Sequence, residues 1–245
     1  MLTAEVAVAK VAKYAVCESG DSVEVVERPR GGLSVVMADG QRSGSSAKAI
    51  SNIAVGKAIS LLGEGVRDGA AARAAHDYLL TQRNGQVSAE LTILSIDLES
   101  RTLLVTRNSR CPVLVAGTGP DGSAAWRVLE AAAEPAGVQR LARPVIIQFP
   151  FGSGLTVVAF TDGIVHAGSR YGAPLDPVRV LDSLSPQSRE SAQATADALL
   201  AAALAADEGR PRDDTTVVVL RVFERPVAEG PEVRRMSLTY PISSA

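Results

Sequence analysis

Cysteine, histidine and long apolar runs are scarce in this sequence, and charge of the two signs is nearly balanced. The two cysteines, Cys17 and Cys111, lie far apart without the spacing of a zinc site, so we expect both to be reduced and structural, with a disulfide or a nucleophile as the alternative. The 25 Lys and Arg residues against 27 Asp and Glu residues leave no basic field for nucleic acid or anionic lipid. No stretch is apolar enough to cross a bilayer and no signal-peptide pattern follows Met1, so we expect a cytoplasmic protein without membrane partners.

The 245 residues are enough for one domain with a sizeable core, and enough for an enzyme. Apolar patterns predict strands over residues 3–15, 23–27, 33–38, 89–97, 102–108, 113–116, 126–129, 145–149, 155–161 and 215–222. Helical spacing predicts helices over residues 45–62, 70–82 and 188–206. The first three strands are expected to form an antiparallel meander. Together these elements predict a layered α+β domain over residues 1–223, followed by a proline-rich, charged tail over residues 224–245 with a candidate edge strand at 237–240.

One strand ends in an aspartate and a glycine. The apolar run over residues 33–38 breaks off into Asp39 and Gly40, and a helical pattern follows. A carboxylate delivered into a glycine-bearing turn suggests a site where a metal or phosphate approaches the backbone. Taken alone, the pair is more typical of an ordinary turn.

Three further aspartates fit the same description. Asp21, Asp162 and Asp213 also lie at strand boundaries, and no histidine or cysteine accompanies them. Oxygen ligands without nitrogen or sulfur select hard cations such as Mg²⁺ or Mn²⁺. If the four carboxylates converge, divalent cations are the natural way to neutralise their repulsion.

These motifs resemble the metal-dependent protein phosphatases of type 2C, the PPM-type enzymes. The resemblance is to the bacterial SpoIIE-like branch, with its small RsbX-like regulators of stress sigma factors, and it covers nearly the whole chain up to about residue 222. The motifs that carry it, in the order of the family, are Ser19-Gly20-Asp21-Ser22, Ala38-Asp39-Gly40 with Ser43-Gly44, Asn108-Ser109-Arg110-Cys111-Pro112, Phe160-Thr161-Asp162-Gly163-Ile164 and Asp213-Asp214-Thr215-Thr216-Val217-Val218.

The resemblance implies an α-β-β-α fold, in which helix pairs flank a central antiparallel β-sandwich with two divalent cations, Mn²⁺ or Mg²⁺, at one end. It implies that Asp39 bridges the metals, that the carbonyl of Gly40 binds one, and that Asp162 and Asp213 complete the other. Asp21 resembles an outer or third ligand. The cations of such enzymes activate water for in-line attack on phosphorus, which makes Asp39, Asp162 and Asp213 the expected catalytic residues.

Two motifs depart from the pattern of the family at three positions. Arg42 and Arg110 stand where glycine is usual, and Cys111 stands where histidine is usual. We hypothesise that the guanidinium of Arg42 binds the substrate phosphate; the alternative is an exposed arginine at a helix entry. We expect a surface or packing role for His76 and a loop role for His166, with general acid catalysis as the alternative for each.

The resemblance predicts a metal-dependent serine/threonine protein phosphatase. Its expected substrate is the phosphoserine or phosphothreonine of a bacterial regulatory protein, plausibly a STAS-domain regulator of a sigma factor. Two alternatives stay open, a catalytically impaired phosphatase-like binding module in a regulatory complex and a phosphatase for a small molecule.

Overall fold

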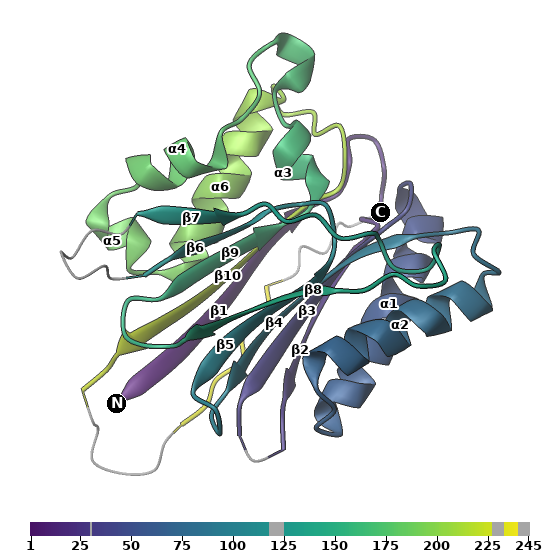
Figure 1. The fold of residues 1–245 in the computed structure, drawn as a ribbon. Coiled ribbons are helices and arrows are strands. Elements are labelled where there is room, and N and C mark those ends of the chain that lie inside the picture. Colours follow the sequence, from purple (N-terminus) through teal and green to yellow (C-terminus); the bar gives the residue numbers. More distant parts are fainter. Residues whose placement is uncertain (30, 118–124, 227–232, 240–245) are drawn as a thin grey trace.

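Two five-stranded antiparallel sheets pack face to face between two layers of helices in the computed structural model, which describes residues 1–29, 31–117, 125–226 and 233–239 (Figure 1). In spatial order, the first sheet consists of β1 (Leu2–Val11), β10 (Thr215–Glu224), β9 (Thr156–Phe160), β6 (Val113–Ala116) and β7 (Trp126–Leu129). The second sheet consists of β2 (Asp21–Glu27), β3 (Leu33–Gly40), β4 (Ala89–Asp97), β5 (Thr102–Asn108) and β8 (Val145–Pro150). The α+β prediction, with layers in the order α-β-β-α, is confirmed.

Helices cover the outer face of each sheet. The second sheet is covered by α1 (Gly44–Gly63) and α2 (Asp68–Gln82). The first sheet is covered mainly by α6 (Ala192–Ala206), and the shorter helices of that layer are α3 (Asp162–His166), the 3-10 turn η1 (Ser169–Tyr171), α4 (Pro177–Ser183) and α5 (Pro186–Arg189). In the ranges that the structure describes, no helix is both long enough and apolar enough to cross a membrane.

The inner strands of the sandwich are buried on both faces, whereas the edge strands are partly exposed. On β10, Val218 and Leu220 pack in the core between the sheets, whereas Val217 and Val219 pack with Leu199 of α6. A strand buried on both faces needs an unbroken apolar run, and the sequence supplies one at this point.

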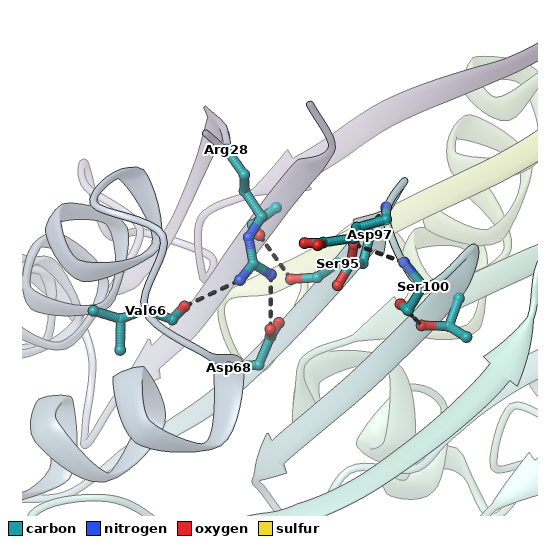
Figure 2. A network of polar contacts seen from close by, with 9 residues as sticks. Arg28, Val66, Asp68, Ser95, Asp97 and Ser100 are labelled. Atoms are coloured by element: carbon teal, nitrogen blue, oxygen red, sulfur yellow. Dashed lines mark hydrogen bonds and ion pairs between the residues drawn. The ribbon is translucent and has the colours of Figure 1, made fainter. Parts of the chain in front are cut away.

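A buried ion pair joins the second sheet to its helices. At the end of β2, Nη1 of Arg28 donates to Oδ2 of Asp68 at 2.7 Å, and Nη2 donates to the carbonyl of Val66 at 3.0 Å (Figure 2). Asp68 is the first residue of α2, where a carboxylate also interacts favourably with the helix dipole. The contact fixes the turn between α1 and α2 against the end of β2.

The predicted meander of the first three strands is wrong. β1 pairs with β10 along its whole length, from Leu2 opposite Glu224 to Val11 opposite Thr215, whereas β2 and β3 form a hairpin in the other sheet. Residues 12–20 therefore cross from one sheet to the other. Turn residues show where a strand ends but not which sheet it joins. β1 joins the first sheet because β10, a long apolar strand, pairs with it over ten residues.

The last predicted helix is divided in two. Residues 188–206 contain the end of α5 and the whole of α6. A new helix starts after Ser191, because its hydroxyl caps α6 by accepting from the amide of Ala194 at 3.2 Å. The helices α3 and α4 were not predicted, since one or two turns carry too little apolar periodicity.

The tail is only partly described. Residues 225–226 and 233–239 form neither helix nor strand, so the expected edge strand is absent over residues 237–239, while residues 227–232 and 240–245 lie outside the described ranges. Arg234 forms an ion pair with Glu27 at the end of β2.

Candidate active site

Three carboxylates form a row across the second sheet at one end of the sandwich. Asp21 on β2 is paired with Asp39 on β3, and Asp39 is paired with Glu90 on β4. Residues paired directly across strands point to the same face. Val35 and Met37, four and two residues before Asp39, pack in the core between the sheets. The row therefore points into the space between the two sheets.

Two carboxylates reach the same space from the first sheet. Asp162 opens α3 just beyond β9, and Asp213 lies just before β10. Together with Asp39 and Glu90, both line a cavity of about 370 Å³. The other residues that line it are Lys13, Gly40, Gln41, Arg42, Ser43, Ser88, Arg110 and Pro135. The structure thus gathers five of the six predicted site residues, Asp39, Gly40, Arg42, Asp162 and Asp213, at one cavity.

The glycines that follow two of these aspartates allow close packing of the backbone. A Cβ on Gly40 would lie 2.0 Å from the carbonyl oxygen of Ala47 in α1. A Cβ on Gly163 would lie 2.4 Å from the carbonyl oxygen of Asp214. Both distances are far inside van der Waals contact, so only glycine fits at these two positions. At each of them the start of a helix and the boundary of a strand pack directly against one another.

The carboxylates around the cavity repel one another. Burial, and then the neighbouring carboxylates of Asp21, Asp162 and Asp213, raise the pKa of Asp39 to about 10. Burial, followed by Asp213, raises the pKa of Asp162 to about 6. Without a counter-charge Asp39 therefore keeps a proton at neutral pH, and a cation in the cavity would favour its ionised form.

Asp21, the sixth predicted site residue, does not line the cavity. Its side chain is fully buried, and Oδ2 accepts hydrogen bonds from Oγ1 of Thr216 at 2.6 Å and Oγ1 of Thr161 at 3.0 Å. These bonds tie the second sheet to the first. Burial raises the pKa of Asp21 to about 6, and its Oδ1 atom has no partner among the described residues.

Two lysines approach the backbone of Asp21. Nζ of Lys48 in α1 donates to its carbonyl oxygen at 2.6 Å, and Nζ of Lys10 in β1 donates to the same atom at 3.1 Å. Burial lowers the pKa of Lys10. The two ammonium groups offset part of the negative charge, and sequence reasoning missed both because each belongs to an element distant from Asp21 along the chain.

Glu90 is a further residue that sequence reasoning missed. Its Oε2 atom accepts from the hydroxyl of Ser109 at 2.6 Å and from the backbone amide of Arg110 at 2.7 Å. Glu90 therefore holds the loop after β5 beside Asp39. The available signal was a charged residue within a strand whose neighbours on both sides, Ala89 and Leu91, are buried.

The sequence model of the family described as stage II sporulation protein E (SpoIIE) matches residues 29–223. The chain belongs to the SpoIIE family. A search of curated proteins by sequence finds no significant match.

Solved structures show the same fold. The phosphatase domain and a regulatory fragment of SpoIIE from Bacillus subtilis give a TM-score of 0.78 at 19% identity, over 92% of this chain and 65% of that one. RsbX in complex with magnesium gives a TM-score of 0.66 at 15% identity, over 91% of this chain and 100% of that one. The catalytic domain of the serine/threonine phosphatase PstP with two manganese ions gives 0.64 at 16% identity, over 91% and 100%. This SpoIIE-family chain therefore has the PP2C-like fold, and it spans less than two thirds of the first of these structures.

The donors in this SpoIIE-family site suit a hard divalent cation. The acidic groups of the cavity offer only oxygen, Oδ1 of Asp21 is buried without a partner among the described residues, and Asp39 faces several other acids. In the described ranges no three histidine, cysteine, aspartate or glutamate side chains form a complete metal-binding group. The carboxylates therefore line an open cavity and do not form a complete set of metal ligands by themselves.

Three cationic side chains also line the cavity, namely those of Lys13, Arg42 and Arg110. Arg42 is exposed and has a φ of 80°, a left-handed conformation that glycine adopts without strain. Glycine is the residue that the resemblance implies at this position, and this backbone conformation agrees with it. Nη2 of Arg110 lies 3.4 Å from Oε2 of Glu134, in an exposed pair.

Asp214 and His76 make hydrogen bonds that stabilise the fold, and neither lines the cavity. Oδ1 and Oδ2 of Asp214 accept from the amides of Lys13 and Gly20 at 3.0 and 2.9 Å, and its own amide donates to Oδ1 of Asp213 at 3.0 Å. His76 is buried, and its Nδ1 accepts from the amide of Gly137 at 3.0 Å, which agrees with the expected packing role.

His166 and the cysteines lie apart from the described wall of the cavity. His166 ends α3 and is exposed rather than lying in a loop. Cys17 is exposed and Cys111 is buried, and both are free thiols. Burial raises the pKa of the Cys111 thiol, so the reactive thiolate is disfavoured.

Proposed function

We propose that this chain is a metal-dependent serine/threonine protein phosphatase. The observation that carries the proposal is the convergence of Asp39, Asp162 and Asp213, from both sheets, on one cavity at the end of the sandwich. Membership of the SpoIIE family and the PP2C-like fold support the same activity. The proposed catalytic unit is residues 1–223, with residues 224–245 as a tail, and the proposed location is the cytoplasm.

We assign the metal ligands to carboxylates and one carbonyl. Asp39 is the proposed bridge between two cations, Mn²⁺ or Mg²⁺, with the carbonyl of Gly40 beside one and Asp162 and Asp213 beside the other. Asp21, whose buried Oδ1 atom has no partner among the described residues, is the proposed outer ligand. When bound, such cations supply an acidified water and the positive charge that phosphoryl transfer requires.

The side chains around the proposed cations position the substrate. Arg42 is the proposed phosphate ligand, because it lines the cavity, its guanidinium has no partner among the described residues, and a planar fork suits phosphate oxygens. Lys13 and Arg110 add positive charge at the same cavity. The raised pKa of the buried Cys111 thiol and the absence of His166 from the described wall argue against a phosphocysteine or phosphohistidine intermediate.

The proposed substrate is a phosphorylated regulatory protein of the STAS type. This part of the proposal rests on the resemblance to SpoIIE and RsbX, whose structures share the fold. The exposed cavity agrees with a phosphoserine or phosphothreonine presented by a folded protein.

The first experiment measures phosphate release from p-nitrophenyl phosphate and from a phosphoserine STAS protein. The protein is assayed with Mn²⁺, with a chelator and as the Asp39→Asn variant. We expect turnover that needs the metal and is lost in the variant. Binding of Mn²⁺ without turnover on any phosphoprotein would instead favour the impaired binding module, and failure to bind the metal would contradict both.

A further inference from the structure

A second cavity adjoins the proposed active site. It has a volume of about 310 Å³ and lies where the start of α1 meets the turn after α2. Gln41 and Arg42 line both cavities, so the two are neighbours. The backbone amide of Gln41 donates to the carbonyl of Ser88 at 2.9 Å, and Oε1 of Gln41 accepts from the amide of Ser88 at 3.2 Å. These paired bonds fix the boundary between the two cavities.

The second cavity differs from the first in charge. Its charged lining residues are Arg42 and Arg83, and no aspartate or glutamate is among the described residues that line it. Ile50 and Val87 supply an apolar part of the wall. Within the described ranges neither arginine makes an ion pair or a hydrogen bond through its guanidinium. The first cavity, in contrast, contains four carboxylates. The second cavity is therefore complementary to a short acidic side chain.

We infer that the second cavity is a specificity subsite for an aspartate or glutamate that neighbours the phosphoserine in the protein substrate. The inference rests on the proposed phosphatase function, because it assigns the phosphate to the first cavity. The carboxylate of the substrate lies between Arg42 and Arg83, while the phosphate lies on the other side of Gln41. Arg42 thus faces both groups, and Arg83 contacts only the neighbouring acid.

The reach of a peptide agrees with this assignment. An extended chain advances about 3.3 Å per residue, so a side chain two or three residues from the phosphoserine reaches an adjoining cavity. Exposed ion pairs are individually weak. A carboxylate that meets two arginines is expected to lower KM about three- to tenfold, with little change in kcat, because the contact is the same in the ground and transition states.

The test uses phosphoserine peptides that carry a single glutamate, glutamine or lysine at each position within three residues of the phosphoserine. Steady-state kinetics with Mn²⁺ should show the lowest KM for glutamate at one position, and Arg83→Glu should transfer the preference to lysine. Arg73→Glu is the matched control, because Arg73 is an exposed residue of α2, the helix that ends just before Arg83, and it lines neither cavity. The control should keep the preference for glutamate.

A binding measurement separates this inference from the proposed function. Fluorescent peptides with a non-hydrolysable phosphonate in place of the phosphate are titrated into wild type and Arg83→Glu, and anisotropy reports the affinity. The glutamate peptide should bind wild type more tightly than the lysine peptide, and the order should reverse in the variant. Equal affinities would overturn the subsite even if metal-dependent turnover is found. Loss of turnover with the expected order of affinities would overturn the phosphatase function and leave the subsite standing.

Discussion

Asp21 and Asp39 are paired directly across β2 and β3, yet their carboxyl groups have different surroundings. Asp21 is held by hydroxyl donors from the first sheet, whereas Asp39 faces the cavity among other acids. The carboxylate of Asp21 therefore helps to join the two sheets. The carboxylate of Asp39 is repelled by its acidic neighbours, and a bound cation would reduce that repulsion. This difference leads to opposite expectations for their removal.

Replacement of Asp39 should stabilise the metal-free protein. Its pKa in the folded state is raised from 3.8 to about 10, so the folded protein binds the proton more tightly than the unfolded chain does. The stability that this proton gives is complete below pH 3.8 and is lost as pH rises toward 10. The free energy of unfolding should therefore fall with pH, by up to about 1.4 kcal/mol per pH unit for each proton released.

Chemical denaturation of the metal-free protein between about pH 5 and about pH 9 would measure this slope. The Asp39→Asn variant should have a flatter slope and a higher melting temperature at neutral pH. Asp182→Asn, at an exposed position of α4, is the control and should reproduce the wild-type slope. A variant less stable than wild type at the upper end of the range would contradict the assigned repulsion.

Loss of a hydroxyl that holds Asp21 should have the opposite effect. In Thr216→Val the shape of the side chain is kept, but Oδ2 of Asp21 loses its 2.6 Å donor. Because the carboxylate is buried, we expect a loss of about 1–3 kcal/mol in the free energy of unfolding. Thr216→Ser keeps the donor and should lose much less. A valine variant as stable as wild type would show that this bond between the sheets contributes nothing.

Local signals in the sequence predicted most of the fold and most of the site. The long strands and the helices α1 and α2 were predicted because their apolar patterns persist over many residues. Asp39, Asp162 and Asp213 were found because each interrupts such a pattern at a strand end. Motif order then suggested a shared metal-binding role for them, through resemblance to a family.

The missed features depend on contacts between distant parts of the chain. The sheet to which β1 belongs is decided by its pairing with β10, more than two hundred residues away. The role of Glu90 is decided by its position opposite Asp39 and by the amide of Arg110. No local pattern records either relationship.

Two neighbouring aspartates before β10 should separate stability from metal binding. Asp214 is buried and accepts from the amides of Lys13 and Gly20, so Asp214→Ala leaves two donors unpaired and should cost about 2–4 kcal/mol. Asp213 is half-buried at the cavity, where it accepts from the amide of Asp214 but also repels Asp39 and Asp162. Because these two effects oppose one another, Asp213→Ala should change the stability of the metal-free protein little.

Melting temperatures with and without Mn²⁺ distinguish the two variants. A metal that binds only the folded state raises the melting temperature by linkage. Asp214→Ala should melt lower but still respond to Mn²⁺, whereas Asp213→Ala should lose most of the response. The reverse pattern would exchange the roles assigned to the two residues.

The backbone at Arg42 should be strained whatever side chain other than glycine it carries. Its φ of 80° costs a residue with a Cβ about 1 kcal/mol relative to glycine. Arg42→Gly and Arg42→Ala both remove the guanidinium, but only the glycine variant relieves the strain. Comparison of the two variants therefore separates the conformation from the charge.

Both variants at Arg42 should raise KM for a phosphoprotein by a similar factor, of about five- to tenfold, because both lose the proposed phosphate ligand. The glycine variant should be more stable than the alanine variant by about 1 kcal/mol in chemical denaturation. Arg101→Gly is the control, since Arg101 has a φ of 54° in the hairpin between β4 and β5 and does not line the cavity. It should gain stability with wild-type KM. A KM that is unchanged in both Arg42 variants would mean that this arginine is an exposed residue at a helix entry and that the phosphate is bound by other groups.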